Sequence, residues 1–249
     1  MPEVKIVLNP LYQHLSTFVN TLPNKFKEEG ESIYKGRNEL KVYHVNGIDL
    51  CVKEYRKPAL YNQIIYTYFR APKCQRAYDF AEKVMQKGFD TPEPIAYIVC
   101  KKNGLIQKAY FVSMLVSNMN MLYDFGKKPL AEVEHIAKDL AKYTAQLHEK
   151  EIYHKDYSPG NILYQEDVNG TKFCLVDINR MSFGPISQKK GCANFARLWG
   201  SKELFVTFAT EYANYRGFDV QACQKEVLAA RNKFWKRYKK KHEICFDLD

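Results

Sequence analysis

The sequence predicts an α+β fold with two lobes, a small antiparallel sheet followed by a mostly helical lobe. Short apolar runs separated by turn residues fill the chain up to about residue 116. Apolar residues then recur at helical spacing over residues 130–149, and further helices are predicted at about 194–198, 202–215 and 220–240. We therefore assign residues 1–116 to the N-terminal lobe, with residues 1–30 as an extension, and residues 117–249 to the C-terminal lobe.

The N-terminal extension is expected to contain one helix. Asn9 is a typical helix N-cap and Pro10 suits the first helical position, so the helix should begin there and run to about residue 20. Four apolar residues would then face inwards: Leu11, Leu15, Phe18 and Val19.

The N-terminal sheet is expected to begin as a three-stranded meander. Residues 33–35, 39–45 and 48–54 have strand character, and Asn46-Gly47 is a strong two-residue hairpin signal. Helices are predicted at 61–70 and at 75–87, the second ending before Gly88. Residues 95–100 and 109–116 should form another hairpin.

Residues 154–163, with the sequence HKDYSPGNIL, indicate a function. Asp156 and Asn161 should lie on one tight loop, and Asp177 follows the next apolar strand. A hairpin turn at Asn169-Gly170 would return Asp177 to Asn161. In kinase chemistry the first Asp takes or orients the proton of the acceptor hydroxyl, while the Asn and the second Asp hold Mg²⁺ against the nucleotide phosphates. The sequence therefore predicts a phosphotransfer site.

A simpler interpretation of the same residues is a polar turn before a buried strand, because Asp, Ser, Pro, Gly and Asn all favour turns. His154, two residues before Asp156, and the hairpin that leads to the second Asp disfavour it. We expect His154 to hold the loop through hydrogen bonds to the backbone rather than to take part in the reaction.

Lys53 lies near the end of the third predicted strand, in Leu50-Cys51-Val52-Lys53-Glu54-Tyr55. In a nucleotide-binding lobe a lysine there would neutralise nucleotide phosphates, whereas the simpler interpretation is a solvated lysine at a strand end. An acid on the helix at 75–87 should pair with Lys53. Glu82 and Asp79 are both candidates, and helical periodicity does not choose between them. Gly36 is the only glycine in the turn between the first two predicted strands, so backbone N–H groups there should bind the phosphates weakly.

Composition restricts the classes of protein. A hydrophobic content of 46% allows a sizeable core, and the formal charge of +10 suggests an anionic partner. The seven cysteines are widely spaced and contain no C-x2-C pair, so neither a disulfide framework nor a zinc site is indicated. We expect a cytoplasmic protein, because no secretion signal or membrane span is recognisable. Nucleic acid is disfavoured as a partner, since no binding motif is found.

With these residues in place, the chain resembles the lipopolysaccharide kinase family, the Kdo and core-heptose kinases, within the protein-kinase-like superfamily. The resemblance runs from about Gly30 to Asp177. It is carried by Lys53, by Gly88 with Thr91-Pro92-Glu93-Pro94-Ile95-Ala96, by His154-x-Asp156-x4-Asn161 and by Asp177. It implies a two-lobed kinase fold that uses ATP and Mg²⁺, with a sugar hydroxyl of lipopolysaccharide as the acceptor. Lys53 would then bind ATP phosphates, Asp156 would be the catalytic base, and Asn161 and Asp177 would bind metal.

The chain departs from protein kinases after Asp177. The metal-binding triplet Asp-Phe-Gly is Asp177-Ile178-Asn179 here, and no Ala-Pro-Glu segment follows. This favours a glycan or small-molecule acceptor over a peptide. Two alternatives stay open, a kinase of a protein or of a soluble small molecule, and a pseudokinase or binding protein that works through a basic surface.

That basic surface would come from residues 231–241, which carry seven cations and no acid. On a helix, Val227, Ala230, Phe234 and Tyr238 would share one stripe with the cations beside it, as in helices that lie on a membrane surface. The stripe could also pack against the C-terminal lobe and leave the cations in water. The first arrangement predicts peripheral contact with the inner face of an anionic membrane, and the second predicts packing alone. The sequence indicates nothing about oligomeric state.

Overall fold

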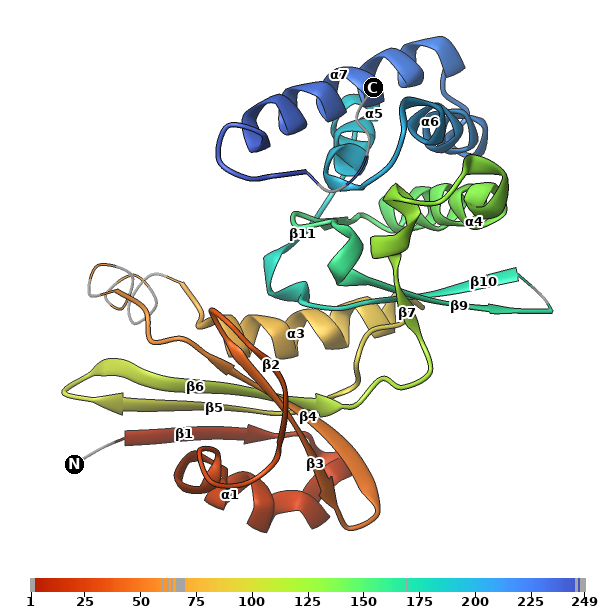
Figure 1. Ribbon diagram of the computed structural model, residues 1–249. Coiled ribbons are helices and arrows are strands. Elements are labelled where there is room, and N and C mark those ends of the chain that lie inside the picture. Colours follow the sequence, from red (N-terminus) through yellow and green to blue (C-terminus); the bar gives the residue numbers. More distant parts are fainter. Residues whose placement is uncertain are drawn as a thin grey trace. The chain divides into compact units, whose positions relative to one another are not determined.

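The computed structural model describes residues 3–59, 61, 63, 65, 70–168, 170–244 and 246. The chain divides into two compact units, Met1–Ser117 and Asn118–Asp249 (Figure 1). The sequence places this boundary after residue 116. The helix predicted over 61–70 lies largely outside the described residues, and so does part of the turn predicted at Asn169-Gly170.

The N-terminal unit is built on one six-stranded sheet. Neighbouring strands are antiparallel throughout, in the order β1-β5-β6-β4-β3-β2. The bounds are β1 Glu3–Leu8, β2 Glu31–Lys35, β3 Glu39–Val45, β4 Ile48–Tyr55, β5 Pro94–Lys102 and β6 Leu105–Met114. The predicted meander and the β5–β6 hairpin are confirmed. The short apolar run at the start of the chain forms the edge strand β1, which pairs with β5.

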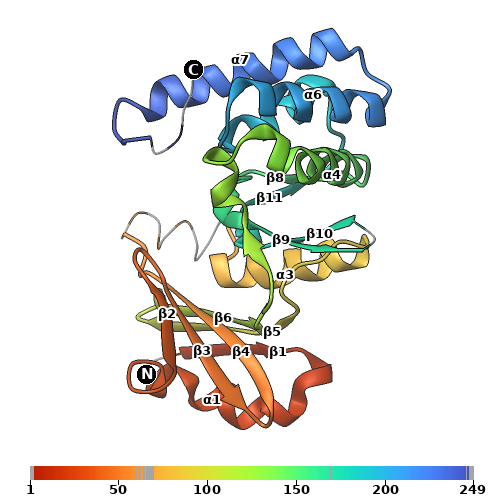
Figure 2. The same cartoon turned by 45° about the vertical axis from the view of Figure 1, so that its right-hand side comes forward.

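Helices cover both faces of this sheet (Figure 2). The 3-10 helix η1 (Pro10–Leu15) and α1 (Ser16–Lys25) supply Leu15, Val19 and Leu22 to one core, with Leu50 and Val52 of β4. The helix α3 (Lys73–Gln86) packs on the other face, where Cys74, Ala77 and Tyr78 meet Tyr55, Tyr97 and Phe111. Because strand residues alternate between faces, Lys53 lies on the α3 side together with Tyr55.

The cap predicted at Asn9 is confirmed, but the inward position of Leu11 is wrong. The side chain of Asn9 accepts a hydrogen bond from the backbone N–H of Leu11 at 3.0 Å. The first turns are 3-10 rather than α-helical, and each 3-10 residue turns the chain further than an α-helical residue does. Leu11 therefore points outwards and is 77% exposed, while Leu22 and Phe26 are buried.

The C-terminal unit is centred on α4, Leu130–Glu149, whose bounds match the prediction. Its predicted inner face is buried, from Val133 and Ile136 through to Leu147. The helices α6 (Lys202–Arg216) and α7 (Val220–Tyr238) pack in succession, α6 on α4 and α7 on α6. Two short elements precede α6 in the chain: the helix α5 (Gln188–Cys192), which was not predicted, and the 3-10 helix η5 (Ala193–Arg197).

Two small sheets hold the segments that carry the candidate site. Strand β8 (Ile152–His154) pairs with β11 (Met181–Phe183). Strand β9 (Ile162–Asp167) pairs with β10 (Gly170–Leu175) and β7 (Asn120–Met121). Three 3-10 turns complete this region: η2 (Leu122–Gly126), η3 (Pro159–Asn161) and η4 (Ile178–Arg180). The loop at 154–161 therefore starts in one sheet and ends in the other.

The buried stripe of α7 differs from the one predicted. Cys223, Val227, Arg231 and Trp235 are buried, whereas Ala230, Phe234 and Tyr238 are only half-buried. Arg231 leaves the predicted cationic surface because its guanidinium donates to the Gly200 carbonyl at 3.0 Å and lies over the Phe205 ring. Six cations stay exposed at this end of the chain: Lys233, Lys236, Arg237, Lys239, Lys240 and Lys241. No helix among the described residues has both the length and the apolar character of a bilayer span.

Candidate functional site

The loop that carries Asp156 is anchored to the core helix α4 by Tyr157. The Tyr157 hydroxyl lies 2.8 Å from the Thr144 hydroxyl, and both side chains are buried. Gly160 passes under Tyr123 of η2, so closely that a Cβ atom there would lie 2.1 Å from the tyrosine hydroxyl oxygen. The sequence of the loop is therefore constrained by packing as well as by chemistry.

His154 holds the loop through backbone contacts, as predicted. Its Nδ1 accepts a hydrogen bond from the Asp156 N–H at 3.1 Å, so Nε2 carries the proton and donates to the Val176 carbonyl at 3.2 Å. Burial lowers the pKa of His154, which favours this neutral form. One buried ring therefore fixes the start of the loop to the residue before Asp177.

Asn161 and Asp177 are brought together by the β9–β10 hairpin. Ile162 is opposite Leu175, and one step beyond it the Val176 N–H donates to the Asn161 carbonyl at 3.0 Å. The Asn161 amide nitrogen donates to the Asp156 carbonyl at 2.8 Å, which orients the amide oxygen away from that carbonyl. The predicted return of Asp177 to Asn161 is confirmed.

Asp177 adopts a left-handed backbone conformation, with φ of 51°, and this turns the chain out of β10. One of its carboxylate oxygens accepts a hydrogen bond from the amide of Asn179, which is itself buried. The triplet Asp177-Ile178-Asn179 thus uses its third residue to orient the first, a role that Gly in the kinase triplet cannot fill.

The donors at this site fit a magnesium ion. Asn161 and Asp177 supply amide and carboxylate oxygens, the ligand type that Mg²⁺ prefers, and Mg²⁺ normally takes few protein ligands and keeps several waters. Over the ranges that the structure describes, no group of three or more His, Cys, Asp or Glu side chains is placed to hold a metal. A site of the zinc type is therefore not found in those ranges.

Asp156 contacts two arginines that the sequence reasoning missed. Arg180 of η4 donates through Nη1 to Oδ2 at 3.0 Å, and Arg197 of η5 donates through Nη1 to Oδ1. The Asp156 side chain is 22% exposed, against 58% for Arg180 and 36% for Arg197. The Arg197 guanidinium also lies 5.2 Å above the Phe234 ring of α7. Arg180 was within reach of motif reasoning, only three residues after Asp177, but Arg197 had no local signal.

A buried polar network supports the start of the loop that carries Asp156. His148 of α4 contacts the Tyr212 hydroxyl at 2.9 Å and the Asn194 side-chain oxygen at 2.9 Å, and the Asn194 amide donates to the His154 carbonyl at 2.9 Å. His148 is therefore buried, with a partner at each ring nitrogen. His135 is exposed and pairs with Glu166.

We expect acid to destabilise the protein through this network. Burial lowers the pKa of His148 to about 4, whereas an unfolded chain binds that proton near pH 6.5. The unfolded state therefore binds more protons between these values, and stability falls as the pH falls from about 6.5 to about 4, by about 3 kcal/mol for this group. Urea unfolding across this range measures the loss. His148→Gln should flatten the slope, and His135→Gln is the matched exposed control. An unchanged slope in His148→Gln would contradict the assignment.

In the N-terminal unit, Lys53 sits in the middle of the sheet, opposite Leu40 of β3 and Phe111 of β6. Its ammonium lies 5.4 Å from the centre of the Tyr55 ring. Asp79 is half-buried on α3 and Glu82 is exposed. Burial and the nearby Glu82 carboxylate raise the pKa of Tyr78 to about 12. Which of the two acids pairs with Lys53 stays a prediction.

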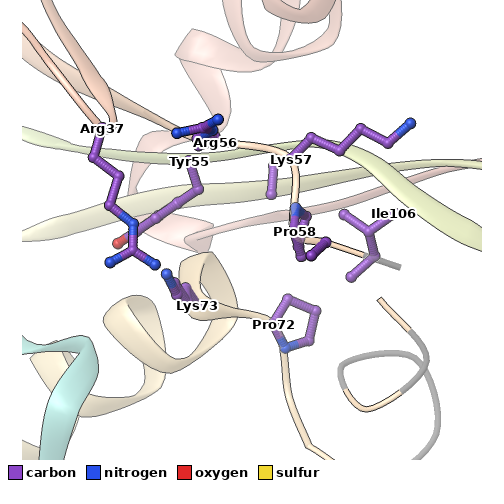
Figure 3. Close-up of a pocket in the computed structure, with 10 residues that line it drawn as sticks. Arg37, Tyr55, Arg56, Lys57, Pro58, Pro72, Lys73 and Ile106 are labelled. Atoms are coloured by element: carbon purple, nitrogen blue, oxygen red, sulfur yellow. The ribbon is translucent and has the colours of Figure 1, made fainter. Parts of the chain in front are cut away.

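A cationic pocket lies in the same unit, with a volume of about 600 Å³ (Figure 3). Tyr55 lines it, with the turn after β2, the segment after β4 and the start of α3. Four lining residues are cations and none is an acid: Arg37, Arg56, Lys57 and Lys73. Figure 3 shows the Arg37 and Lys73 side chains directed to the same side of the pocket, whereas Lys57 extends away. The Asn38 side chain ties the turn to β4 by accepting from the Arg56 N–H at 3.2 Å.

Comparison with known proteins identifies the family. A model of the lipopolysaccharide kinase (Kdo/WaaP) family matches residues 20–220. The chain belongs to this family. The Kdo/WaaP match spans both units and contains Lys53, Asp156, Asn161 and Asp177. Arg180 and Arg197 also lie within it.

Named relatives and a solved structure agree with this family. The chain is 25% identical over 144 residues to a 3-deoxy-D-manno-octulosonic acid kinase of Mannheimia succiniciproducens, and 24% identical over 139 residues to the one of Pasteurella multocida. These matches cover 56% and 54% of this chain, and 60% and 58% of the relatives. The chain thus spans about 60% of the length of the curated relatives it matches.

The structure of WaaP in complex with acyl carrier protein superposes with a TM-score of 0.65, over 96% of this chain and all of that one, at 12% identity. At this identity the likeness shows the fold. The protein therefore has the two-lobed, protein-kinase-like α+β fold that the sequence predicts.

Proposed function

We propose that the protein is an ATP-dependent kinase that transfers the γ-phosphate of ATP to a sugar hydroxyl of the lipopolysaccharide core. The observation that carries the proposal is the convergence of Asp156, Asn161 and Asp177 through one loop and one hairpin. His154 joins that loop to the end of the hairpin through hydrogen bonds to the backbone of Asp156 and Val176. Membership of the Kdo/WaaP family supports it.

The residues divide the reaction among them. Asp156 orients the acceptor hydroxyl and takes its proton. The hydroxyl oxygen bonds to the γ-phosphorus while the bond from that phosphorus to the β–γ bridging oxygen breaks, and ADP leaves. Asn161 and Asp177 would hold Mg²⁺, which neutralises charge on the phosphates when bound. His154, Asn179 and Asn194 hold these groups in place and touch no substrate in this scheme.

Lys53 and the cationic pocket form the phosphate-binding part of the N-terminal unit in this proposal. Tyr55, which lines the pocket, follows Lys53 on the same face of β4, about 7 Å further along the strand. Arg37 lies on the turn after β2, where a glycine-rich loop would otherwise supply backbone N–H groups. Side-chain cations from Arg37 and Lys73 would thus compensate for the glycines that this turn lacks.

The proposed acceptor is a 3-deoxy-octulosonic acid residue, the sugar acid in the names of both relatives. Two aromatic rings beside the loop suit a sugar. Tyr123 is 43% exposed, and its ring centre lies 5.0 Å from that of Trp199. Their faces would pack against the apolar side of a sugar ring while its hydroxyl reaches Asp156.

We expect Mg·ATP to stabilise the protein. At a hundredfold excess over Kd, a ligand adds about 2.7 kcal/mol to the free energy of unfolding, which corresponds to roughly 5–10 °C in Tm for a chain of this size. Thermal unfolding with and without Mg·ATP measures the shift. Lys53→Met should reduce it, and Lys101→Met, on the same sheet and paired with Glu3, is the matched control. An unchanged Tm at saturating Mg·ATP would refute the kinase proposal.

Transfer itself is tested with purified protein, ATP, Mg²⁺ and a lipopolysaccharide precursor that contains the octulosonic acid. Mass spectrometry should show a product that has gained one phosphate. A complementary experiment compares lipopolysaccharide from cells with and without the gene, where loss of one phosphate is expected. Transfer to a protein or an aminoglycoside, with none to the glycolipid, would replace this acceptor by another.

We propose further that the protein is cytoplasmic and binds the inner face of the membrane peripherally. The six exposed cations at the end of α7 and just beyond it support this proposal. Phe234 of α7 contacts Arg197, which in turn contacts Asp156, so this surface and the catalytic residue belong to the same unit. An anionic glycolipid held by these cations would therefore lie near the catalytic loop.

A further inference from the structure

The two arginines on Asp156 occupy the oxygens that a catalytic base needs. Arg180 donates to one carboxylate oxygen and Arg197 to the other. A hydroxyl whose proton passes to Asp156 must reach one of these oxygens at about 2.6–3.2 Å. Each carboxylate oxygen can accept a second hydrogen bond, so a hydroxyl can share an oxygen with a guanidinium, but it competes with that cation for the oxygen, and moving one guanidinium away frees Asp156 fully.

The charges at this cluster do not cancel. Asp156 carries one negative charge and the two arginines carry two positive charges, because a guanidinium stays protonated in proteins. Breaking a charge-assisted contact without a substitute is costly. An acceptor that brings its own anion would supply that substitute and would balance the remaining charge.

We propose that Arg180 and Arg197 bind an ionised carboxylate of the acceptor, and that this binding releases Asp156 to act on the acceptor hydroxyl. The inference rests on the proposed function. It adds a specificity device, because an acceptor without the carboxylate leaves the base covered by its two arginines.

The geometry favours a carboxylate as the ligand. The two guanidinium groups already hold one carboxylate between them, that of Asp156, each through a single nitrogen. Each guanidinium has further N–H donors in a planar fork that matches a carboxylate. The sugar named in both relatives is an acid, so its carboxylate is ionised at neutral pH.

The two arginine side chains differ in how far their contacts confine them. Arg197 is confined by the Phe234 ring and by the Lys155 carbonyl, to which its Nη1 donates at 3.5 Å. Arg180 is the more exposed of the two, and its side chain contacts Asp156. Arg180 is therefore the guanidinium expected to swing from Asp156 to the acceptor, while Arg197 stays in place and contacts both.

The test compares an acceptor that contains 3-deoxy-octulosonic acid with its carboxyl methyl ester. For the wild-type protein, kcat/KM should be roughly 10–100-fold higher for the acid, the range of a charge-assisted hydrogen bond. Arg180→Gln should raise KM for the acid and bring the acid-to-ester ratio of kcat/KM close to one. Arg197→Gln should act in the same direction. Lys138→Gln, which removes an exposed cation paired with Glu134 on α4, is the matched control and should keep the wild-type ratio.

The outcomes separate this inference from the proposed function. Equal wild-type turnover of acid and ester overturns the inference and leaves the kinase intact, whereas no transfer to either acceptor overturns both. If Arg180→Gln lowers kcat equally for both acceptors, or raises KM for Mg·ATP, then the arginine acts on the transferred phosphoryl group and the inference is wrong. Because Arg180 is exposed, its replacement should leave the fold intact, and calorimetric binding of the acid without ATP gives a second readout.

Discussion

Asp156→Asn should lower the rate of phosphoryl transfer by roughly 10²–10⁴-fold, the span expected when a positioned general base is lost. The amide has almost the same shape as the carboxylate, but it cannot take the hydroxyl proton. Its loop should persist, because the Asp156 N–H and carbonyl, rather than its side chain, bind His154 and Asn161. Single-turnover kinetics with Mg·ATP and the glycolipid acceptor measure the effect.

The control for this variant is Asp167→Asn, which alters a carboxylate paired with Lys172 on the β9–β10 hairpin. It should transfer phosphate at the wild-type rate. Asp156→Asn should retain the stabilisation by Mg·ATP, since Lys53, Asn161 and Asp177 are unchanged. A variant at Asp156 that turns over like the wild type would show that another group takes the proton.

Replacing Lys239, Lys240 and Lys241 together by Gln should weaken binding to anionic liposomes by about 10²-fold at low salt. Each cation near such a surface contributes about 1 kcal/mol, and three are removed. Binding of the wild-type protein should fall steeply as salt is raised, because the attraction is screened over about 10 Å at 0.1 M. Vesicle sedimentation at two salt concentrations measures both effects.

A second triple variant controls for total charge. Lys138 and Lys142 on α4 and Lys150 just after it are exposed, and their replacement by Gln removes the same charge from another surface. Liposome binding should then change little. If the wild-type protein binds neutral and anionic liposomes equally, or binds neither, the end of α7 serves packing alone and the membrane proposal fails.

The sequence was informative where the contacts are local. Asp156, Asn161 and Asp177 come together through one short loop and one hairpin, and both have turn residues and apolar periodicity that can be recognised. The helix over Leu130–Glu149 was predicted to the residue because its apolar stripe is long and regular.

Contacts between distant segments could not be predicted. Arg197 reaches Asp156, and Asn194 reaches both His148 and the His154 carbonyl, only because η5 packs beside the loop. No spacing in the chain signals this. The phase of α7 was wrong for a related reason: periodicity treats arginine as polar, but Arg231 is buried where a carbonyl and an aromatic ring both contact its guanidinium.

The contact between Arg197 and Phe234 also affects when the catalytic unit is completed during synthesis. The ribosome makes Asp156, Asn161 and Asp177 before Phe234. Phe234 follows Asp177 by roughly 3–11 s at elongation rates of about 5–20 residues per second. During this interval the nascent chain contains Asn161 and Asp177, but Arg197 lacks the ring that it contacts beside Asp156. The helix α7 therefore completes the contacts around Asp156, and a chain released before α7 would carry the candidate site without this support.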